Sequence, residues 1–159
     1  MLQTVLLGVH VTAGIVGLLL GPVALAAAKQ AGWHPRLGLA YQGAVAVMTT
    51  TALGLVALAP GQLWGLGLIA AATEAAALAG WRVRRRHAPG WLGKHIRLMC
   101  GSYLSFVTAA LVVNWASPLA WVLPTLIGTP LINRAVTRAN RAGSPPGTAA
   151  RPLQTGTAP

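Results

Sequence analysis

Long apolar stretches separated by short polar segments make up most of the chain up to Asn133. A membrane-spanning helix needs roughly 20 mostly apolar residues, at about 1.5 Å rise each, to cross a hydrocarbon core roughly 30 Å thick. Five stretches fit or approach this length, at Thr4–Ala28, Leu39–Ala59, Gln62–Trp81, Leu98–Ala116 and Leu119–Asn133. The pattern therefore predicts an all-α integral membrane bundle of five transmembrane helices, within a helical domain covering residues 1–141.

The last of these stretches is short and carries Pro124 and Pro130, so by itself it also fits a kinked, tilted or re-entrant segment. The charge pattern favours a full crossing. All twelve Lys and Arg side chains fall in three stretches, which are Lys29 to Arg36, Arg82 to Arg97 and Arg134 to Arg151. Because basic loops are retained on the cytoplasmic side, five crossings place all three stretches there, with the N-terminus outside and the C-terminus in the cytoplasm.

Composition identifies the solvent of this chain. It is 55% hydrophobic and only 8% charged, whereas soluble domains carry roughly 25% charged residues. We therefore expect a multi-pass protein whose partner is the lipid bilayer of the bacterial inner membrane. An apolar start without a basic leader favours a retained first helix over a cleaved signal peptide. Residues 142–159, rich in Gly, Ser, Pro and Thr, are predicted to form a disordered cytoplasmic tail.

The net charge of +11 would suit a nucleic-acid partner, but the basic residues lie at the ends of apolar stretches and not along an amphipathic face. No nucleic-acid partner is therefore expected. Small residues recur every fourth position in the first and third stretches, which allows close helix packing within the bundle or a contact with a homo-oligomer or membrane-complex partner. These residues are Ala13, Gly17, Gly21, Ala72, Ala76 and Gly80.

Glu74 is the one acidic residue of the chain and falls near the middle of the predicted third helix. An ionisable group at this depth costs about 2.5 kcal/mol or more, so it marks a ligand or proton site by default. The alternative is a protonated carboxyl that ties helices together through a neighbouring hydroxyl. Counting residues from the basic stretches puts Tyr103 at the same depth, and we expect its hydroxyl to donate to Glu74. The hydroxyls of Thr49 to Thr51 either line a path or bond back to preceding carbonyls.

Three of the four histidines, His34, His87 and His95, lie in or beside basic loops, while His10 lies in the outer part of the first helix. His10 cannot share a haem with the others, and its depth predicts a hydrogen bond with Asn114. His34 and His95 could converge to bind a transition metal or one haem, with His87 as a third ligand. The alternative is that these histidines are solvated, since nearby positive charge disfavours a bound cation.

No motif indicates hydrolytic chemistry. The chain has no Gly-rich phosphate loop, no Ser-His-Asp order and no pair of carboxylates. Its single cysteine, Cys100, excludes an internal disulfide and a cysteine-based zinc finger, and we expect it to be a small buried side chain.

Four segments follow one another in a recognisable order. They are His10 through Gly21-Pro22, His34-Pro35-Arg36-Leu37-Gly38-Leu39-Ala40-Tyr41, His95-Ile96-Arg97-Leu98-Met99-Cys100-Gly101-Ser102-Tyr103, and Leu123-Pro124-Thr125-Leu126-Ile127-Gly128-Thr129-Pro130. Over residues 5 to 135 this order resembles a bacterial family of small multi-pass predicted membrane proteins of unknown function. The resemblance implies the architecture and directs attention to the matched positions His34, Tyr41, His95 and Tyr103. The His-x-x-x-Met helix start also looks like that of small membrane proteins that assist haem-enzyme assembly.

Three functions are thus compatible with the sequence. The first is a non-enzymatic accessory or small-ligand-binding membrane module around Glu74, Tyr41, Tyr103 and the histidines. The second is a haem- or metal-binding redox subunit that uses His34 and His95. The third is a small proton-coupled transporter centred on Glu74.

Overall fold

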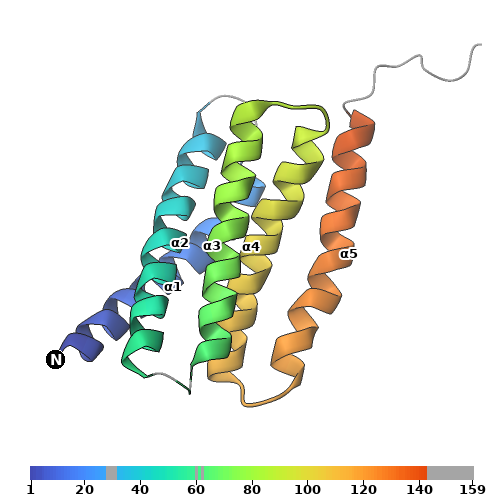
Figure 1. The fold of residues 1–159 in the computed structure, drawn as a ribbon. Coiled ribbons are helices and arrows are strands. Elements are labelled where there is room, and N and C mark those ends of the chain that lie inside the picture. Colours follow the sequence, from blue (N-terminus) through green and yellow to red (C-terminus); the bar gives the residue numbers. More distant parts are fainter. Residues whose placement is uncertain (28–31, 60, 62, 143–159) are drawn as a thin grey trace, which may run out of the picture.

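The computed structural model describes residues 1–27, 32–59, 61 and 63–142, and these residues form five α-helices and no strand. The helices are α1 (Leu2–Ala26), α2 (Trp33–Leu58), α3 (Trp64–Arg86), α4 (Trp91–Asn114) and α5 (Leu119–Ala142). They run alternately up and down with short connections (Figure 1). The predicted all-α bundle of five helices is confirmed.

Each helix is long and apolar enough to cross a membrane. Their 23 to 26 residues correspond to roughly 35 to 39 Å of helix at 1.5 Å per residue, which exceeds a hydrocarbon core of roughly 30 Å. Large apolar side chains cover the outer surface; on α1 alone, Leu2, Val5 and Leu19 are each more than 60% exposed. Such a surface suits lipid, so the architecture is that of a multi-pass membrane protein.

Two helices begin earlier than the hydropathy pattern predicted. The helix expected from Leu39 begins at Trp33, and the one expected from Leu98 begins at Trp91. The preceding residues, Gly32 and Gly90, have φ angles of 107° and 72°, which only glycine adopts readily, so the turn ends and the helix begins directly after them. His34 and His95 therefore lie near the N-terminal ends of helices α2 and α4 and not in loops.

The fifth helix extends nine residues beyond the predicted Asn133, to Ala142, so its last turns are polar. Pro124 and Pro130 lie within it and do not end it. Each proline lacks the N–H that would bond to the fourth residue before it, which accounts for the bend between the lower and upper parts of α5 in Figure 1. The predicted disordered tail covers residues 142–159. Residues 143–159 of it lie outside the described part of the chain.

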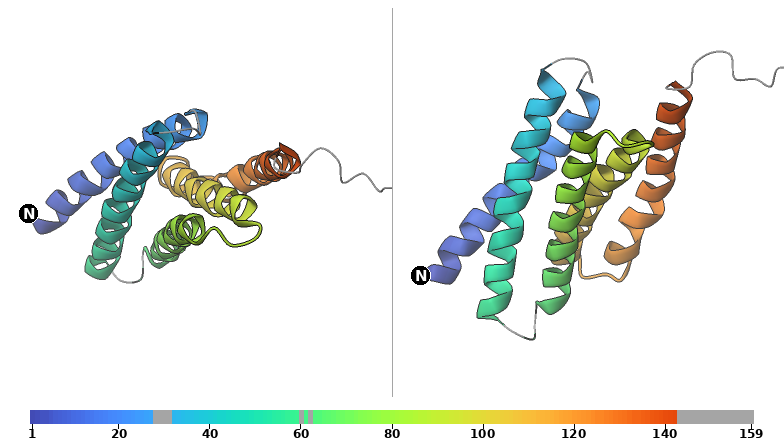
Figure 2. Two further views of the ribbon diagram at one scale, coloured as in Figure 1. Left: turned by 90° about the horizontal axis from the view of Figure 1, so that it is seen from above. Right: turned by 45° about the horizontal axis from the view of Figure 1, so that its top comes forward.

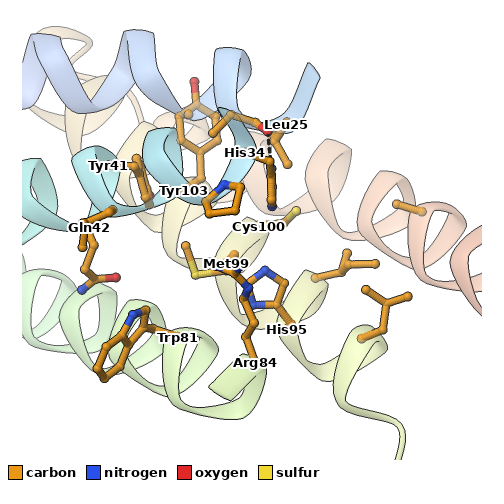
Figure 3. A pocket seen from close by; sticks show the side chains of 18 of the residues that line it. Leu25, His34, Tyr41, Gln42, Trp81, Arg84, His95, Met99, Cys100 and Tyr103 are labelled. Atoms are coloured by element: carbon orange, nitrogen blue, oxygen red, sulfur yellow. Dashed lines mark hydrogen bonds between the residues drawn. The ribbon is translucent and has the colours of Figure 1, made fainter. Parts of the chain in front are cut away.

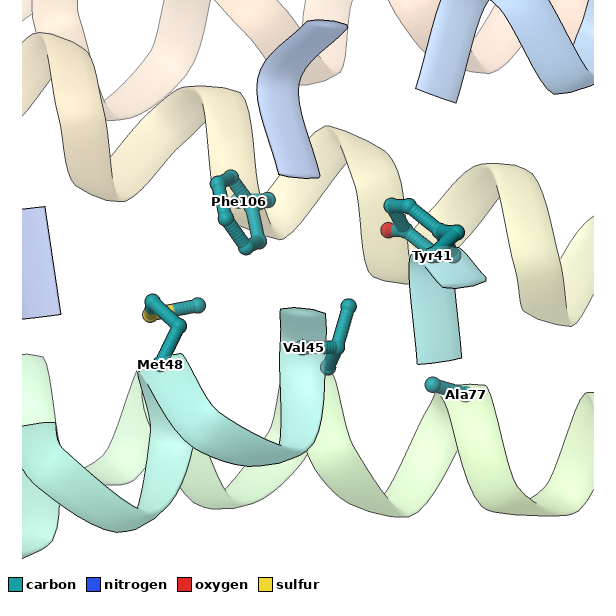
Figure 4. Close-up of a cluster of buried hydrophobic side chains, with 5 residues drawn as sticks. All are labelled: Tyr41, Val45, Met48, Ala77 and Phe106. Atoms are coloured by element: carbon teal, nitrogen blue, oxygen red, sulfur yellow. The ribbon is translucent and has the colours of Figure 1, made fainter. Parts of the chain in front are cut away.

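The helices are packed in chain order, with α1 against α2, α2 against α3, α3 against α4 and α4 against α5. Helix α1 crosses the others obliquely, so that its N-terminal half points away from α3, α4 and α5 and its C-terminal half reaches α4 (Figure 2). The buried centre lies between α2, α3 and α4 (Figure 4). It is formed by Tyr41, Val45, Met48, Ala77 and Phe106.

Three of the small residues in the predicted four-residue repeats mediate contacts within the bundle. A Cβ atom at Gly17 would lie 2.8 Å from Cζ of Phe106, and one at Gly21 would overlap the Tyr103 ring. On α3, a Cβ atom at Gly80 would lie 2.8 Å from the Met99 sulfur. These glycines let α1 and α3 approach α4 closely, as predicted for the intramolecular alternative.

All Lys and Arg residues of the described chain lie at one end of the bundle, which we call the basic end. It comprises the C-terminal ends of α1, α3 and α5 and the N-terminal ends of α2 and α4, at the top of Figure 1. The residues are Arg36, Arg82, Arg84, Arg85, Arg86, Lys94, Arg97, Arg134, Arg138 and Arg141.

Candidate functional site

A cavity of about 420 Å³ opens within the basic end, and we call it the basic-end cavity (Figure 3). Residues of all five helices line it. Helices α2 and α4 stand on two sides of it, and no Cα atom of one lies within 8 Å of a Cα atom of the other. The polar and aromatic lining residues are His34, Tyr41, Gln42, Trp81, Arg84, His87, Trp91, His95, Cys100 and Tyr103.

The structure brings His34 of α2 and His95 of α4 to this one cavity, which is one of the two arrangements that the sequence left open (Figure 3). Both imidazoles are anchored by main-chain carbonyl groups. Nδ1 of His34 lies 2.8 Å from the carbonyl oxygen of Ala24, and Nδ1 of His95 lies 2.9 Å from that of Gly80. A carbonyl oxygen only accepts, so each Nδ1 carries the proton and each Nε2 of the neutral ring keeps its lone pair.

His87 lies at the mouth of the same cavity but in a different setting. It caps the C-terminus of α3 with a left-handed backbone, and it is exposed. Its ring packs edge-on against Trp91, with 4.9 Å between the ring centroids. Among the described residues, no group of three or more His, Cys, Asp or Glu side chains is arranged to hold a metal ion.

Tyr41 and Tyr103 line the cavity side by side, with 6.4 Å between their ring centroids. Ser102 donates to the carbonyl oxygen of Met99 at 2.8 Å, so the buried Tyr41 hydroxyl donates to Ser102 Oγ at 3.2 Å. The Tyr103 hydroxyl donates to the carbonyl oxygen of Leu18 at 3.2 Å. These bonds fix both rings against neighbouring helices.

The predicted hydrogen bond from Tyr103 to Glu74 is wrong. The one phenolic proton of Tyr103 goes to Leu18 on α1, and Glu74 Oε2 instead accepts from Thr49 Oγ1 of α2 at 2.9 Å. Counting residues for depth could not show that Glu74 faces α2. Glu74 does not line the basic-end cavity, and its contact corresponds to the helix-tying alternative.

Thr51 of the threonine run and His10 form a second polar group between α1 and α2, with Nδ1 of His10 3.2 Å from Thr51 Oγ1. Thr50 and Thr51 bond back to preceding carbonyls, as the commoner alternative predicted. The predicted bond between His10 and Asn114 is wrong, since Nδ1 of His10 lies 3.0 Å from the carbonyl oxygen of Met48, and Asn114 donates to the carbonyl oxygen of Ala110 on its own helix. The outer half of α1 lies along α2, which places His10 beside α2.

Cys100, expected to be buried, is half-buried and lines the cavity beside the histidines.

The sequence analysis missed Gln42, whose carboxamide nitrogen and oxygen are both buried and have no hydrogen-bond partner among the described residues. Leaving such a group unpaired costs about 1 to 3 kcal/mol. Gln42 lines the basic-end cavity near Trp81, whose ring is covered by the Arg85 guanidinium at 4.3 Å from its centroid (Figure 3). A signal was present, because His34, Gly38 and Gln42 recur every four residues and so share one face of a helix.

The fold and the cavity define a class, namely a five-helix bundle with membrane-spanning helices and a polar, histidine-bearing cavity at its basic end. Comparisons with protein families, with curated proteins and with solved structures found no match to this chain. The family resemblance drawn from the sequence stays a prediction.

Proposed function

We propose that this chain is a non-enzymatic membrane module that holds a small ligand in the basic-end cavity, as an accessory or assembly factor does. The observation that carries this proposal is the unpaired, buried carboxamide of Gln42 in a cavity that also presents the imidazoles of His34 and His95. Buried polar groups are nearly always satisfied, so an unsatisfied one in a cavity calls for a partner from outside the chain. A volume of about 420 Å³ lies within the range of small-molecule sites.

The ligand site is tested by filling the cavity. Gly38 lines it and a Cβ atom there meets nothing within 4 Å, so Gly38→Phe should occupy the space without a backbone clash. Gly14 on α1 is equally unobstructed but lies outside the lining, so Gly14→Phe is the matched control. We expect mass spectrometry of the purified full chain to find one small molecule per chain in the wild type and in Gly14→Phe. The Gly38→Phe variant should contain at least tenfold less of this molecule per chain.

Two results would contradict the proposal. One is the absence of any stoichiometric small molecule from the wild-type protein, and the other is its full retention in a folded Gly38→Phe variant. Far-ultraviolet circular dichroism and size-exclusion chromatography of each variant in the same detergent report folding. A melting temperature alone does not, because a bound ligand raises it.

The second part of the proposal concerns location. We place the protein in the bacterial inner membrane with its N-terminus outside and its basic end in the cytoplasm, because basic residues flanking membrane helices are retained on that side. All Lys and Arg residues of the described chain share one end, which supports this orientation. The proton-coupled transporter centred on Glu74 stays a prediction.

Orientation is tested with single cysteines in a Cys100→Ala background. A cysteine at Ser144 should be protected from an impermeant maleimide in intact cells and should react after the membrane is permeabilised. A cysteine at Ser117, in the connection at the opposite end, should react in intact cells. The reverse labelling pattern would show that the chain is threaded the other way.

A further inference from the structure

We propose that the ligand of the basic-end cavity is haem, bound with its iron between Nε2 of His34 and Nε2 of His95. This inference rests on the ligand-binding function proposed above and names its ligand. Four features carry it, namely the state of the two imidazoles, the number of ligating side chains, the space between the helices and the charge around the cavity.

The two imidazoles are prepared to ligate a metal. Metal-ligating histidines almost always donate their other ring N–H to a carbonyl oxygen, a carboxylate or water, which fixes the tautomer and the ring direction. His34 and His95 both do so, through main-chain carbonyl oxygens of different helices at 2.8 Å and 2.9 Å. Their Nε2 atoms are then the electron-pair donors that iron requires.

The number of ligands fits haem and does not fit a bare metal ion. A structural zinc site takes four protein ligands and a catalytic one takes three. No such group of His, Cys, Asp or Glu side chains exists among the described residues. Haem brings four nitrogen ligands of its own, so one or two axial side chains complete it. Two histidines from two helices are therefore a sufficient set for haem.

The cavity also has suitable walls. The space is the cavity itself, of about 420 Å³, which is lined by residues of both helices that carry His34 and His95. In Figure 3 the two imidazoles extend into this space from those two helices. Apolar lining residues suit the faces and edges of a porphyrin. They are Leu25, Leu39, Leu92, Ile96 and Met99.

The positive charge around the cavity favours haem over a bare divalent cation. Arg84 lines the cavity, the other described arginines lie at the same end of the bundle, and Glu74, the one acid of the chain, is outside the lining. This surrounding positive charge opposes a bare dication. It favours the two propionate groups of haem, because arginine forms strong charge-assisted bonds with carboxylates. The basic end can thus hold iron only in a ligand that carries its own negative charge.

The test uses the full chain, expressed in haem-replete cells, purified in mild detergent and then supplemented with haemin. We expect a Soret band, about one haem per chain, and the low-spin visible spectrum of two imidazole ligands. His34→Ala and His95→Ala should each lower the haem content at least tenfold, or convert the haem that remains bound to high spin. Added imidazole should then restore the low-spin spectrum. His87→Ala, a histidine change at the same cavity, should keep the haem content and the low-spin spectrum of the wild type.

Should the alanine variants fail to fold, His95→Met provides the second measurement. Methionine is also an axial haem ligand, so this variant should retain haem with an altered visible spectrum and a raised reduction potential. An unchanged spectrum in His95→Met would remove His95 from the iron and overturn the proposal.

Haem binding is overturned by a wild-type chain without a Soret band after haemin addition, or by folded His34→Ala and His95→Ala variants that bind as the wild type does. A stoichiometric small molecule other than haem, such as a quinone, that is lost in Gly38→Phe would also overturn it. That last result would leave the ligand-binding function standing, whereas a chain with no small molecule at all would overturn both.

Discussion

Replacing Gly21 by valine should lower the free energy of unfolding by about 3 kcal/mol, the upper range for overpacking a close contact. The reason is that a Cβ atom at Gly21 of α1 would overlap the ring of Tyr103 on α4. That ring cannot swing aside freely, because its hydroxyl donates to the carbonyl oxygen of Leu18. Reversible unfolding of the purified chain in mixed micelles, with denaturing detergent as the variable, measures the loss.

The matched control is Gly14→Val on the same helix, where a Cβ atom meets nothing within 4 Å. It should change stability by no more than about 0.5 kcal/mol, the usual range for a surface substitution. A double variant, Gly21→Val with Tyr103→Leu, should recover part of the loss, because the smaller side chain frees the space. Equal destabilisation by Gly14→Val and Gly21→Val would show that Gly21 does not stabilise the protein through the close contact between α1 and α4.

The number of helices and the gathering of positive charge at one end could be predicted from sequence because both follow from order along the chain. An apolar stretch of sufficient length crosses a bilayer whatever it packs against. The ends of the helices were harder to predict from sequence, since they depend on backbone angles and caps. Gly32 and Gly90 begin α2 and α4 well before hydropathy rises, and α5 continues past its apolar part as a polar helix.

Contacts between helices were predicted well where several residues shared a face, and poorly where depth was the one guide. Counting residues gives the height of a side chain along its helix but not the direction in which it points. Glu74 and Tyr103 were assigned the same depth on α3 and α4, yet each bonds to a different helix. Convergence of His34 and His95 was one of two alternatives from the sequence. Both residues line the cavity, where main-chain carbonyl groups direct both rings.

Gln42 shows a different limit. A single glutamine in an apolar stretch gives no sign that its amide will lack a partner, because that depends on every helix around it. Its spacing from His34 and Gly38 could have placed it on the cavity face. The unsatisfied amide itself becomes visible only when α2 and α3 are assembled around it.

If the cavity binds a ligand through His95 as proposed, the largest loss of that ligand without replacement of a histidine should come from Gly80→Val. The carbonyl oxygen of Gly80 accepts the Nδ1 proton of His95, and a Cβ atom at Gly80 would lie 2.8 Å from the Met99 sulfur and 3.2 Å from Leu98 Cβ. Methionine yields easily, but Leu98 Cβ is fixed to the backbone of α4, so α3 and α4 must separate. His95 then loses the bond that sets its tautomer and direction.

Loss of an outer-shell partner of this kind typically costs 10- to 100-fold in metal affinity. We therefore expect the purified Gly80→Val variant to retain at least tenfold less ligand than the wild type, measured by the same spectroscopy and mass spectrometry. Gly101→Val is the control, because a Cβ atom there meets nothing within 4 Å. If folded Gly80→Val kept its full ligand content, the bond between Gly80 and His95 would be structural only. Loss of ligand from Gly80→Val but not from Gly101→Val is the expected result, and it would show that close packing of α3 against α4 holds His95 in position.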